Sequence, residues 1–306
     1  MRVVMTGATG LIGSTVTRLL RSRGDEVVAL SRSRDRAQQK LGRDVEVYEW
    51  RDPEAEKPPP AALEGADAVI NLLGEPIAQR WNEAVKRQIR DSRVLGTRSL
   101  VAALAALPEE SAPKTLVSQS AVGYYGWRGD EQVDENGTRG DDFLASVTVA
   151  WEREASAASP RARVVHTRTG VVLARSGGAL AKMLPAFLLG VGGPIAGGRQ
   201  YVPWIHLDDV ASALVYCAAD QRAAGPVNLT APVPVTNREF GRALGRALHR
   251  PAVLPIPAFA LRVLYDGMAS IVTTGQRVVP ARLRALGFEF GYTELDPALR
   301  DVLSRS

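Results

Sequence analysis

The sequence predicts an α/β fold, a doubly wound parallel sheet joined by a smaller C-terminal substrate lobe. Three observations favour this fold. A glycine-rich turn near the N-terminus separates a short apolar run from a helical pattern, strand and helix patterns alternate through the first half of the 306 residues, and the pattern loosens after residue 170. The predicted strands are almost entirely apolar, as expected for a parallel sheet covered on both faces.

The glycine-rich turn has the spacing G-x-x-G-x-x-G, with glycines at Gly7, Gly10 and Gly13. An apolar strand at 3–5 precedes it, helically spaced apolar residues follow at 11–20, and a second strand is expected at 27–30. This order within about 30 residues is typical of a Rossmann-type dinucleotide-binding unit. We expect Gly7 to permit the tight turn, Gly10 to let a pyrophosphate approach, and Gly13 to let the helix pack closely, with phosphates at the helix N-terminus. The alternative is a βα turn with incidental glycines.

The end of the second strand favours NADP(H) over NAD(H). NAD sites usually place a carboxylate there for the ribose 2′-hydroxyl, but here Ser31, Arg32 and Arg34 come before the first carboxylate, Asp35. An Arg can pair with a 2′-phosphate through its planar fork, and a Ser can donate to it. We therefore expect Arg32 to be the main contact, helped by Ser31 or Arg34, although Arg is common throughout this chain.

The later elements are expected in this order. In the first half, strands are predicted at 45–48, 68–73, 115–118 and 163–167, and helices at 81–106 and 141–158. After residue 170, helices are predicted at 180–189 and 208–219, a strand at 225–229, and a helix opening at 236–240. These patterns assign residues 1–174 to a dinucleotide-binding domain to which 206–230 return, and 175–205 with 231–306 to a substrate lobe.

Composition narrows the classes of function. The net charge is +5, and the sequence lacks a dense basic run interleaved with aromatics, so nucleic-acid binding is not indicated. No apolar run approaches the roughly 18 residues that span a membrane, and no signal peptide is expected, which favours a cytoplasmic protein without a membrane partner. The single Cys217 is expected to be buried packing in a reducing compartment. The three histidines lack metal-ligand spacing, so no metal site is expected.

With these motifs placed, the chain resembles the extended short-chain dehydrogenase/reductase superfamily over nearly its full length. The motifs are the turn at 6–13, Asn71-Leu72-Leu73-Gly74, Ser118-Gln119-Ser120-Ala121 before Tyr124-Tyr125-Gly126, Thr169-Gly170-Val171, and the segment 204–210. With further segments at 90–93, 192–204 and 275–280, the chain also resembles one subgroup of this superfamily, the epimerase-family or nucleoside-diphosphate-sugar-epimerase-like proteins. That subgroup ends in a small C-terminal domain of unassigned role, and its activity is poorly defined.

The resemblance implies a set of cofactor contacts. In addition to the three glycines, Ser31 and Arg32, these contacts come from the glycine-rich turn, the ends of later strands and the predicted helix at 81–106. They are Thr9, Leu11, Ile12, Leu72, Leu73, Gly74, Glu75, Arg93, Ser118, Thr169, Gly170 and Val171. For Glu75, a solvated loop carboxylate is the alternative. Trp204 and His206 could line a substrate pocket, but a structural role is favoured for His206.

The catalytic pair of the superfamily is missing. Its members normally use a Tyr general acid/base and a Lys four residues later, because a free Tyr titrates near pH ~10 and needs a nearby cation. Alignment on Glu152 puts Leu144 at the Tyr position and Thr148 at the Lys position. Ser120 matches the family Ser if one residue is inserted before Tyr125, and Tyr124 or Tyr125 could then serve as acid/base from the same loop, with loop packing as the alternative.

An Arg such as Arg93 could replace the missing Lys as the local cation, or it could hold a phosphate. The sequence thus predicts an NADP(H)-dependent oxidoreductase or epimerase-like enzyme with an atypical active site, acting on a nucleotide sugar or another carbonyl compound. A non-enzymatic, redox-responsive NADP(H)-binding regulator is the alternative, and nucleic-acid binding is a distant third. An oligomer is compatible with the long predicted helix at 81–106.

Overall fold

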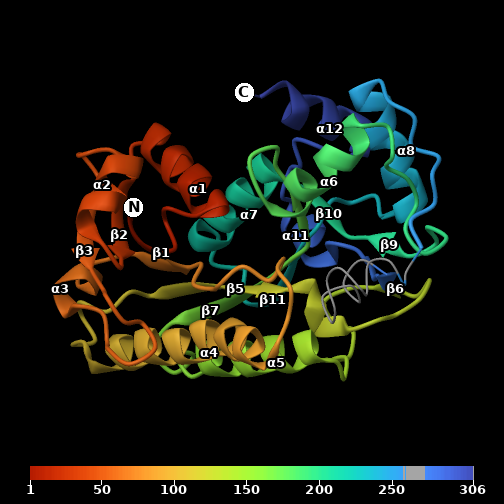
Figure 1. Cartoon of the computed structure of the whole chain (residues 1–306). Helices are drawn as coiled ribbons and strands as arrows, with labels where there is room; N and C mark the ends of the chain where they lie inside the picture. Colours follow the sequence, from red (N-terminus) through yellow and green to blue (C-terminus); the bar gives the residue numbers. More distant parts are fainter. Residues whose placement is uncertain (258, 260–272, 306) are drawn as a thin grey trace.

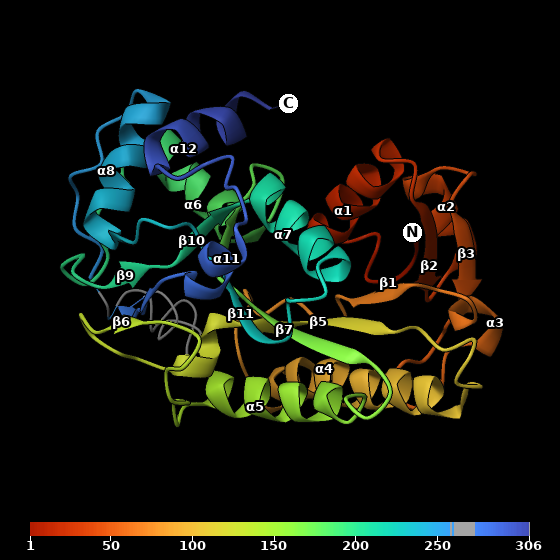
Figure 2. The same cartoon turned by 180° about the vertical axis from the view of Figure 1, so that it is seen from behind.

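The computed structural model describes residues 1–257, 259 and 273–305. Its centre is a seven-stranded sheet in the order β11-β7-β5-β4-β1-β2-β3, and every neighbouring pair is parallel (Figures 1 and 2). The strands are β1 (Arg2–Thr6), β2 (Glu26–Ser31), β3 (Glu46–Glu49), β4 (Ala68–Asn71), β5 (Thr115–Ala121), β7 (Arg163–Thr169) and β11 (Gly225–Leu229). The predicted doubly wound parallel fold is confirmed.

Helices cover both faces of this sheet (Figure 1). One face carries α1 (Leu11–Ser22), α2 (Arg34–Leu41) and α7 (Leu207–Ala219), and the other carries α3 (Pro60–Leu63), α4 (Glu83–Ala106) and α5 (Phe143–Ser156). Successive strand residues alternate between the layers: Val3 and Met5 pack toward α1, whereas Val4 packs toward α4. Burial on both faces explains the continuous apolar runs in the sequence.

Element boundaries differ from the sequence predictions in ways that local chemistry explains. The strand predicted at 68–73 ends at Asn71, because the next backbone N–H, that of Leu72, donates to the Thr6 hydroxyl rather than to a carbonyl of a neighbouring strand. The helix predicted from residue 81 begins at Glu83, because the Asn82 side chain caps it by accepting from the Val85 N–H. The predicted helix opening near residue 236 is confirmed by a capping box between Thr236 and Glu239.

The second lobe has its own apolar core. It contains α6 (Gly178–Leu188), α8 (Asn237–Leu248) and α12 (Leu295–Ser304), which bury Leu180, Phe240 and Leu299 around Trp204. Short strand pairs join its segments, namely β8 (Val171–Leu173) with β10 (Trp204–His206), β9 (Tyr201–Val202) with β12 (Val235–Thr236), and β6 (Gln132–Val133) with β13 (Arg277–Val278). The short helix α11 (Ala281–Leu286) packs against β11. The sequence patterns missed these short strands, and the domain boundaries themselves stay a prediction.

Two further expectations concern burial and membranes. Cys217 is fully buried on α7, and burial raises the pKa of its thiol to about 12, so the expected packing role is confirmed. Among the helices described, none is both long and apolar enough to cross a membrane.

Candidate cofactor and active site

The glycine turn lies at the carboxyl end of β1, where the sheet order places it between β4 and β2. Gly7 has a φ of +63°, which favours glycine, and the Gly10 N–H donates to its carbonyl at 2.9 Å to close the turn. A Cβ at Gly13 would overlap the Gly7 carbonyl oxygen and lie 2.8 Å from the Ala8 Cα. A Cβ at Gly10 would meet only the Gly7 oxygen, at 3.1 Å. Gly13 thus serves close packing, and Gly10 leaves the turn open to a ligand.

The first turn of α1 offers backbone donors at this opening. No side chain caps the helix at Gly10, and its first turn contains no acidic residue. The N–H groups at its start therefore remain available, and the helix dipole adds partial positive charge. These features fit a phosphate group at the turn.

The end of β2 carries an exposed cation. Arg32 is 74% exposed at its side chain, and its Nη1 lies 3.5 Å from Oε1 of Glu75, which follows β4. The Ser31 hydroxyl donates to the Ser33 carbonyl at 3.2 Å, just before α2 begins at Arg34. The structure therefore brings Ser31, Arg32 and Glu75 together at one edge of the glycine turn, and Glu75 has a cationic neighbour rather than water alone.

A buried polar network fixes the end of β4. Thr6 on β1 donates to Asn71 Oδ1 at 2.7 Å, and the Asn71 amide donates to Thr97 on α4 at 2.9 Å. The Leu72 N–H donates to the Thr6 hydroxyl at 2.8 Å, and Asn71 also lies 3.4 Å from the Ser118 hydroxyl. Ser118 is itself buried. This network sets the path of residues 72–74 beside the Gly7 turn.

Arg93 reaches from α4 to the end of β4. Its guanidinium lies against the backbone of Gly74, where a Cβ would be only 2.8 Å from Cζ, and its Nη1 donates to the Ile89 carbonyl at 2.9 Å. Cζ also lies 5.3 Å from the centre of the Trp151 ring on α5. Burial lowers the pKa of Arg93 to about 10, and no carboxylate lies within 4 Å of it among the described residues. A cation in this position suits an anionic ligand.

Ser120, on β5, is tied to a buried ion pair. Its hydroxyl donates to Glu152 Oε1 at 2.7 Å, and Arg168 on β7 donates to both oxygens of the same carboxylate, at 2.8 and 2.9 Å. Ser120 and Arg168 are register partners on adjacent strands, so their side chains project from the same face toward α5. The sequence patterns missed Arg168, although a charged residue within an apolar strand signals a buried partner.

The two tyrosines of the 3-10 helix η1 (Val122–Tyr125) differ in their surroundings. Tyr125 is fully buried; its hydroxyl donates to Asn228 at 2.7 Å and accepts from Arg168 at 3.0 Å, and burial raises its pKa to about 12. Tyr124 is partly exposed, and the Arg168 guanidinium lies 3.4 Å from the centre of its ring. Buried Glu135 completes the cluster by accepting the Asn228 N–H at 3.0 Å. Sequence patterns also missed Glu135 and Asn228.

Neither position of the superfamily's Tyr/Lys pair carries a titratable group. Leu144 lies in the first turn of α5, packed against an apolar cluster with Trp81 and Ile89. Thr148 is buried, and its hydroxyl donates to the carbonyls of Leu144 and Ala145, both at 2.9 Å. Neither Leu144 nor Thr148 therefore offers a group that could transfer a proton here.

The end of β7 turns sharply at Gly170. A Cβ there would overlap the Pro203 carbonyl, to which the Val171 N–H donates at 2.7 Å, so only glycine fits this crossing. Thr169 is buried, and its hydroxyl donates to the Thr167 carbonyl at 3.1 Å. The turn leads into β8 and so connects the sheet with the second lobe.

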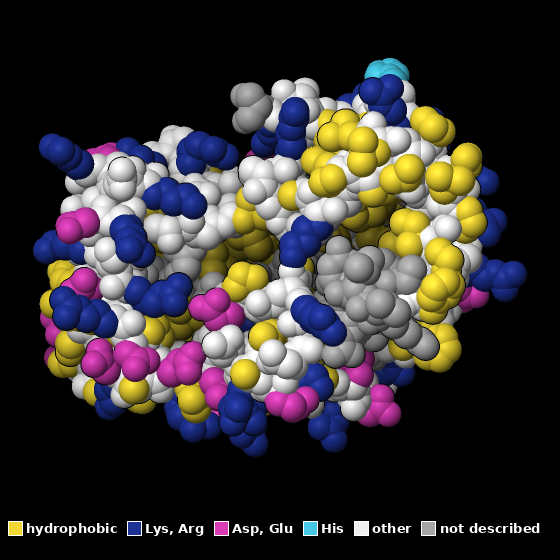
Figure 3. Space-filling model, viewed as in Figure 1, with side chains coloured by type: hydrophobic (Ala, Val, Ile, Leu, Met, Phe, Trp, Pro, Cys, Tyr) yellow, Lys and Arg dark blue, Asp and Glu magenta, His cyan; other side chains and the backbone are white. Residues whose placement is uncertain are grey.

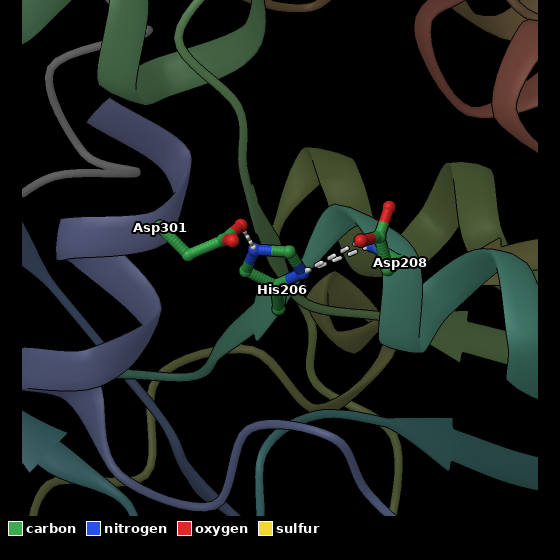
Figure 4. A group of neighbouring side chains, drawn as sticks. All are labelled: His206, Asp208 and Asp301. Carbon is green, nitrogen blue, oxygen red and sulfur yellow. Dashed lines mark hydrogen bonds and ion pairs between the residues drawn. The ribbon is translucent and has the colours of Figure 1, made fainter. Parts of the chain in front are cut away.

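His206 lies between the side chains of Asp208 and Asp301 (Figure 4). It is fully buried; its Nδ1 accepts the Asp208 N–H at 3.1 Å, and its Nε2 lies 3.0 Å from Asp301 on α12. The three side chains are close enough to share a metal ion, but Arg305 lies between the carboxylates, 2.5 Å from Asp208 and 2.7 Å from Asp301. Trp204 is also buried, in the apolar core of the second lobe, and the contacts of His206 agree with the structural role favoured for it. That Trp204 and His206 line a substrate pocket stays a prediction.

The fold, together with the glycine turn at the carboxyl end of β1, defines a class of protein: a dinucleotide-binding α/β protein with a phosphate turn and a second lobe. Residues 3–229 match the model of the NAD dependent epimerase/dehydratase family, and the chain belongs to this family. Residues 256–302 match a domain of unknown function, DUF1731. Together they make the chain an extended short-chain dehydrogenase/reductase of the epimerase-family subgroup.

Relatives match along nearly the whole chain. The epimerase family protein Mb2239 of Mycobacterium bovis is 42% identical, over 99% of this chain and 98% of its own. Human epimerase family protein SDR39U1 is 36% identical over 99% and 100%. A crystal structure of human SDR39U1, isoform 2, with NADPH aligns with a TM-score of 0.89 at 35% identity over 100% of both chains. MoeE5 in complex with UDP-glucose and NAD, 21% identical over 98% and 96% with a TM-score of 0.74, shares the fold.

Proposed function

We propose that this protein is an NADP(H)-dependent oxidoreductase or epimerase-like enzyme with an atypical active site. The observation that carries the proposal is the end of β2, where the exposed guanidinium of Arg32 stands beside the open glycine turn and a carboxylate of the NAD type is missing from the strand end. The structure of human SDR39U1 with NADPH supports the same cofactor.

The cofactor would lie across the carboxyl ends of β2, β1, β4 and β5. The 2′-phosphate would meet Arg32 and Ser31, and the pyrophosphate would meet the turn from Gly7 to Gly13, including the backbone of Thr9, Leu11 and Ile12. The rest of the cofactor would contact residues 72–75, Ser118 and 169–171. Arg93 would supply positive charge beside Gly74. When bound, the nicotinamide supplies or accepts a hydride.

We assign proton transfer to Tyr124. Among the three hydroxyl groups predicted to be catalytic, it alone makes no hydrogen bond to another described side chain, and Arg168 lies against its ring. Tyr125 and Ser120 would act as positioning residues, because their hydroxyl groups already donate to Asn228 and Glu152. The proposed substrate is a small carbonyl compound, and nucleotide sugars are the first class to test, since structural neighbours of this fold were solved with them.

Steady-state turnover tests the enzyme proposal directly. NADPH oxidation at 340 nm would be followed with aldehydes, ketones and nucleotide-linked keto sugars, and isomerisation of nucleotide sugars would be followed by chromatography. Turnover that falls at least about 100-fold in Tyr124→Phe, with cofactor affinity unchanged, supports the assignment. Full activity in that variant would remove Tyr124 from the proton transfer.

A second function, a non-enzymatic NADP(H)-binding regulator, is favoured by one observation. The superfamily's catalytic positions hold Leu144 and Thr148, and the Thr148 hydroxyl is turned to its own helix. Tight cofactor binding without turnover of any carbonyl compound would favour the regulator. A difference in affinity between NADPH and NADP would then be the property to pursue.

A further inference from the structure

Two segments of the second lobe contain no acidic residue. Neither 176–207 nor 240–257 holds an Asp or Glu, in a chain where 33 of 306 residues are acidic. Both segments hold basic residues, namely Lys182, Arg199, Arg242, Arg246 and Arg250. Every Asp, Glu, Lys or Arg within these two segments is therefore basic.

The two segments pack edge to edge. Arg250 Nε donates to the Leu188 carbonyl at 3.1 Å. Further along, the Ile256 N–H donates to the Pro194 carbonyl at 2.9 Å, and the Ala196 N–H donates to the Ile256 carbonyl at 3.0 Å. The end of α6 and the chain that follows α8 thus form one continuous face.

Five aliphatic side chains project from this face. They are Leu188, Leu189 and Val191 at the end of α6, and Val253 and Leu254 after α8, with exposed fractions between 49% and 79%. Figure 3 shows hydrophobic side chains gathered over α6 and the segments beside it. We call these five residues the apolar ridge. Contiguous exposed apolar clusters of this kind are found at interaction sites.

A basic groove adjoins the apolar ridge. It has a volume of about 490 Å³ and is lined by Arg242, Arg246, His249, Arg250 and Val253. Arg246 is paired with Asp296 at 2.8 Å. Arg242 interacts with Glu239 on the same helix, whereas no carboxylate lies within 4 Å of Arg250 or Lys182 among the residues that the structure describes. The apolar ridge and two cations without a carboxylate partner, Arg250 and Lys182, therefore belong to the same two segments.

We propose that the apolar ridge and its basic groove dock on the surface of an anionic phospholipid bilayer. Aliphatic side chains enter the boundary between headgroups and acyl chains, while the cations meet the lipid phosphates. A second copy of the chain fits this face less well, because a symmetric contact would set Arg250 and Lys182 of one copy against the same cations of the other. Nucleic acid fits it poorly too, because the exposed tips are aliphatic and give bases no aromatic platform. Such docking requires no membrane-spanning helix.

Vesicle co-sedimentation of the full-length protein tests the proposal. The two vesicle preparations are phosphatidylcholine alone and three parts phosphatidylcholine with one part phosphatidylglycerol. We expect binding to the anionic vesicles, at least about tenfold weaker binding to the neutral ones, and loss of binding at high salt. Leu189→Asp with Val253→Asp should abolish binding, and Arg250→Gln should weaken it about fivefold.

Arg51→Gln is the matched control, because Arg51 is 77% exposed on the other lobe and its loss changes the net charge equally. It should bind like the wild type. Leu189→Ala, which removes apolar area without adding charge, should reduce binding and tests the ridge if the Asp variant misfolds. Failure of the wild type to bind anionic vesicles would overturn the proposal, as would unchanged binding of folded ridge variants. A dimer in light scattering that the Asp variant dissociates would instead assign the face to a second copy.

Discussion

Arg168 on β7 holds the carboxylate of Glu152 on α5 through two hydrogen bonds, at 2.8 and 2.9 Å, with only 4% and 12% of the two side chains exposed. The same guanidinium donates to the Tyr125 hydroxyl and lies against the ring of Tyr124. This buried ion pair therefore binds the hydroxyl groups of Ser120 and Tyr125 and contacts the ring of Tyr124, the three residues that the sequence predicted to be catalytic. Loss of either charge would disturb the strand, the helix and the tyrosine loop together.

Glu152→Gln should destabilise the protein by about 3 kcal/mol, because it leaves the buried Arg168 without a counterion. Glu154→Gln is a matched control on the same helix: its partner Arg98 is 55% exposed, so we expect a change of less than about 1 kcal/mol. Chemical denaturation measures both. Equal effects of the two substitutions would mean that the buried pair has no special structural role.

Arg32→Ala should weaken NADPH binding by at least about tenfold and leave NADH binding within about twofold, because only NADPH carries the 2′-phosphate. Arg36→Ala on α2 is the control, since its side chain is exposed and the proposal gives it no role. Fluorescence titration with both cofactors measures the ratio. An equal loss of affinity for the two cofactors would contradict the assignment.

Gly10→Val should affect cofactor binding, whereas Gly13→Ala should affect the stability of the fold. Gly10→Val should abolish cofactor binding but keep the fold, because its Cβ meets only the Gly7 oxygen, at 3.1 Å. Gly13→Ala should lower stability by about 1–3 kcal/mol, because its Cβ overlaps the Gly7 carbonyl. Thermal unfolding and calorimetry on the same samples separate the two effects. Retained binding in Gly10→Val would remove the phosphate from this turn.

Acidification should destabilise the fold through two buried histidines. Burial lowers the pKa of both His166 and His206 below the ordinary value, so the unfolded chain binds more protons near pH ~6. Their contribution to stability is complete above pH ~6.5 and is lost as the pH falls through the folded-state pKa values. Denaturation at pH ~7.5 and pH ~6 should show the decrease, and NMR titration should place the pKa values of both imidazoles below the ordinary histidine value. Higher stability at the lower pH would contradict this account.

The parallel sheet could be predicted from the sequence, because its strands are short apolar runs with helical patterns between them. A sheet buried on both faces requires such runs within each strand, so the pattern is visible locally. Gly7, Gly10 and Gly13 were readable for the same reason, since their roles depend on steric limits within one turn. Arg168, Glu135 and Asn228 were not found, because each acts through partners 16 to 103 residues away in the chain. The short strands of the second lobe, such as β6 and β13, depend on pairing across the fold and leave no periodic pattern.

The most direct test of the central claim is calorimetric titration of the purified protein with NADPH, NADP, NADH and NAD. Submicromolar binding of NADPH, with NADH weaker by at least about tenfold, is the predicted result, because the open turn at Gly10 and the guanidinium of Arg32 together fit a 2′-phosphorylated dinucleotide. Absence of binding by all four, or a preference for NADH, would contradict the account.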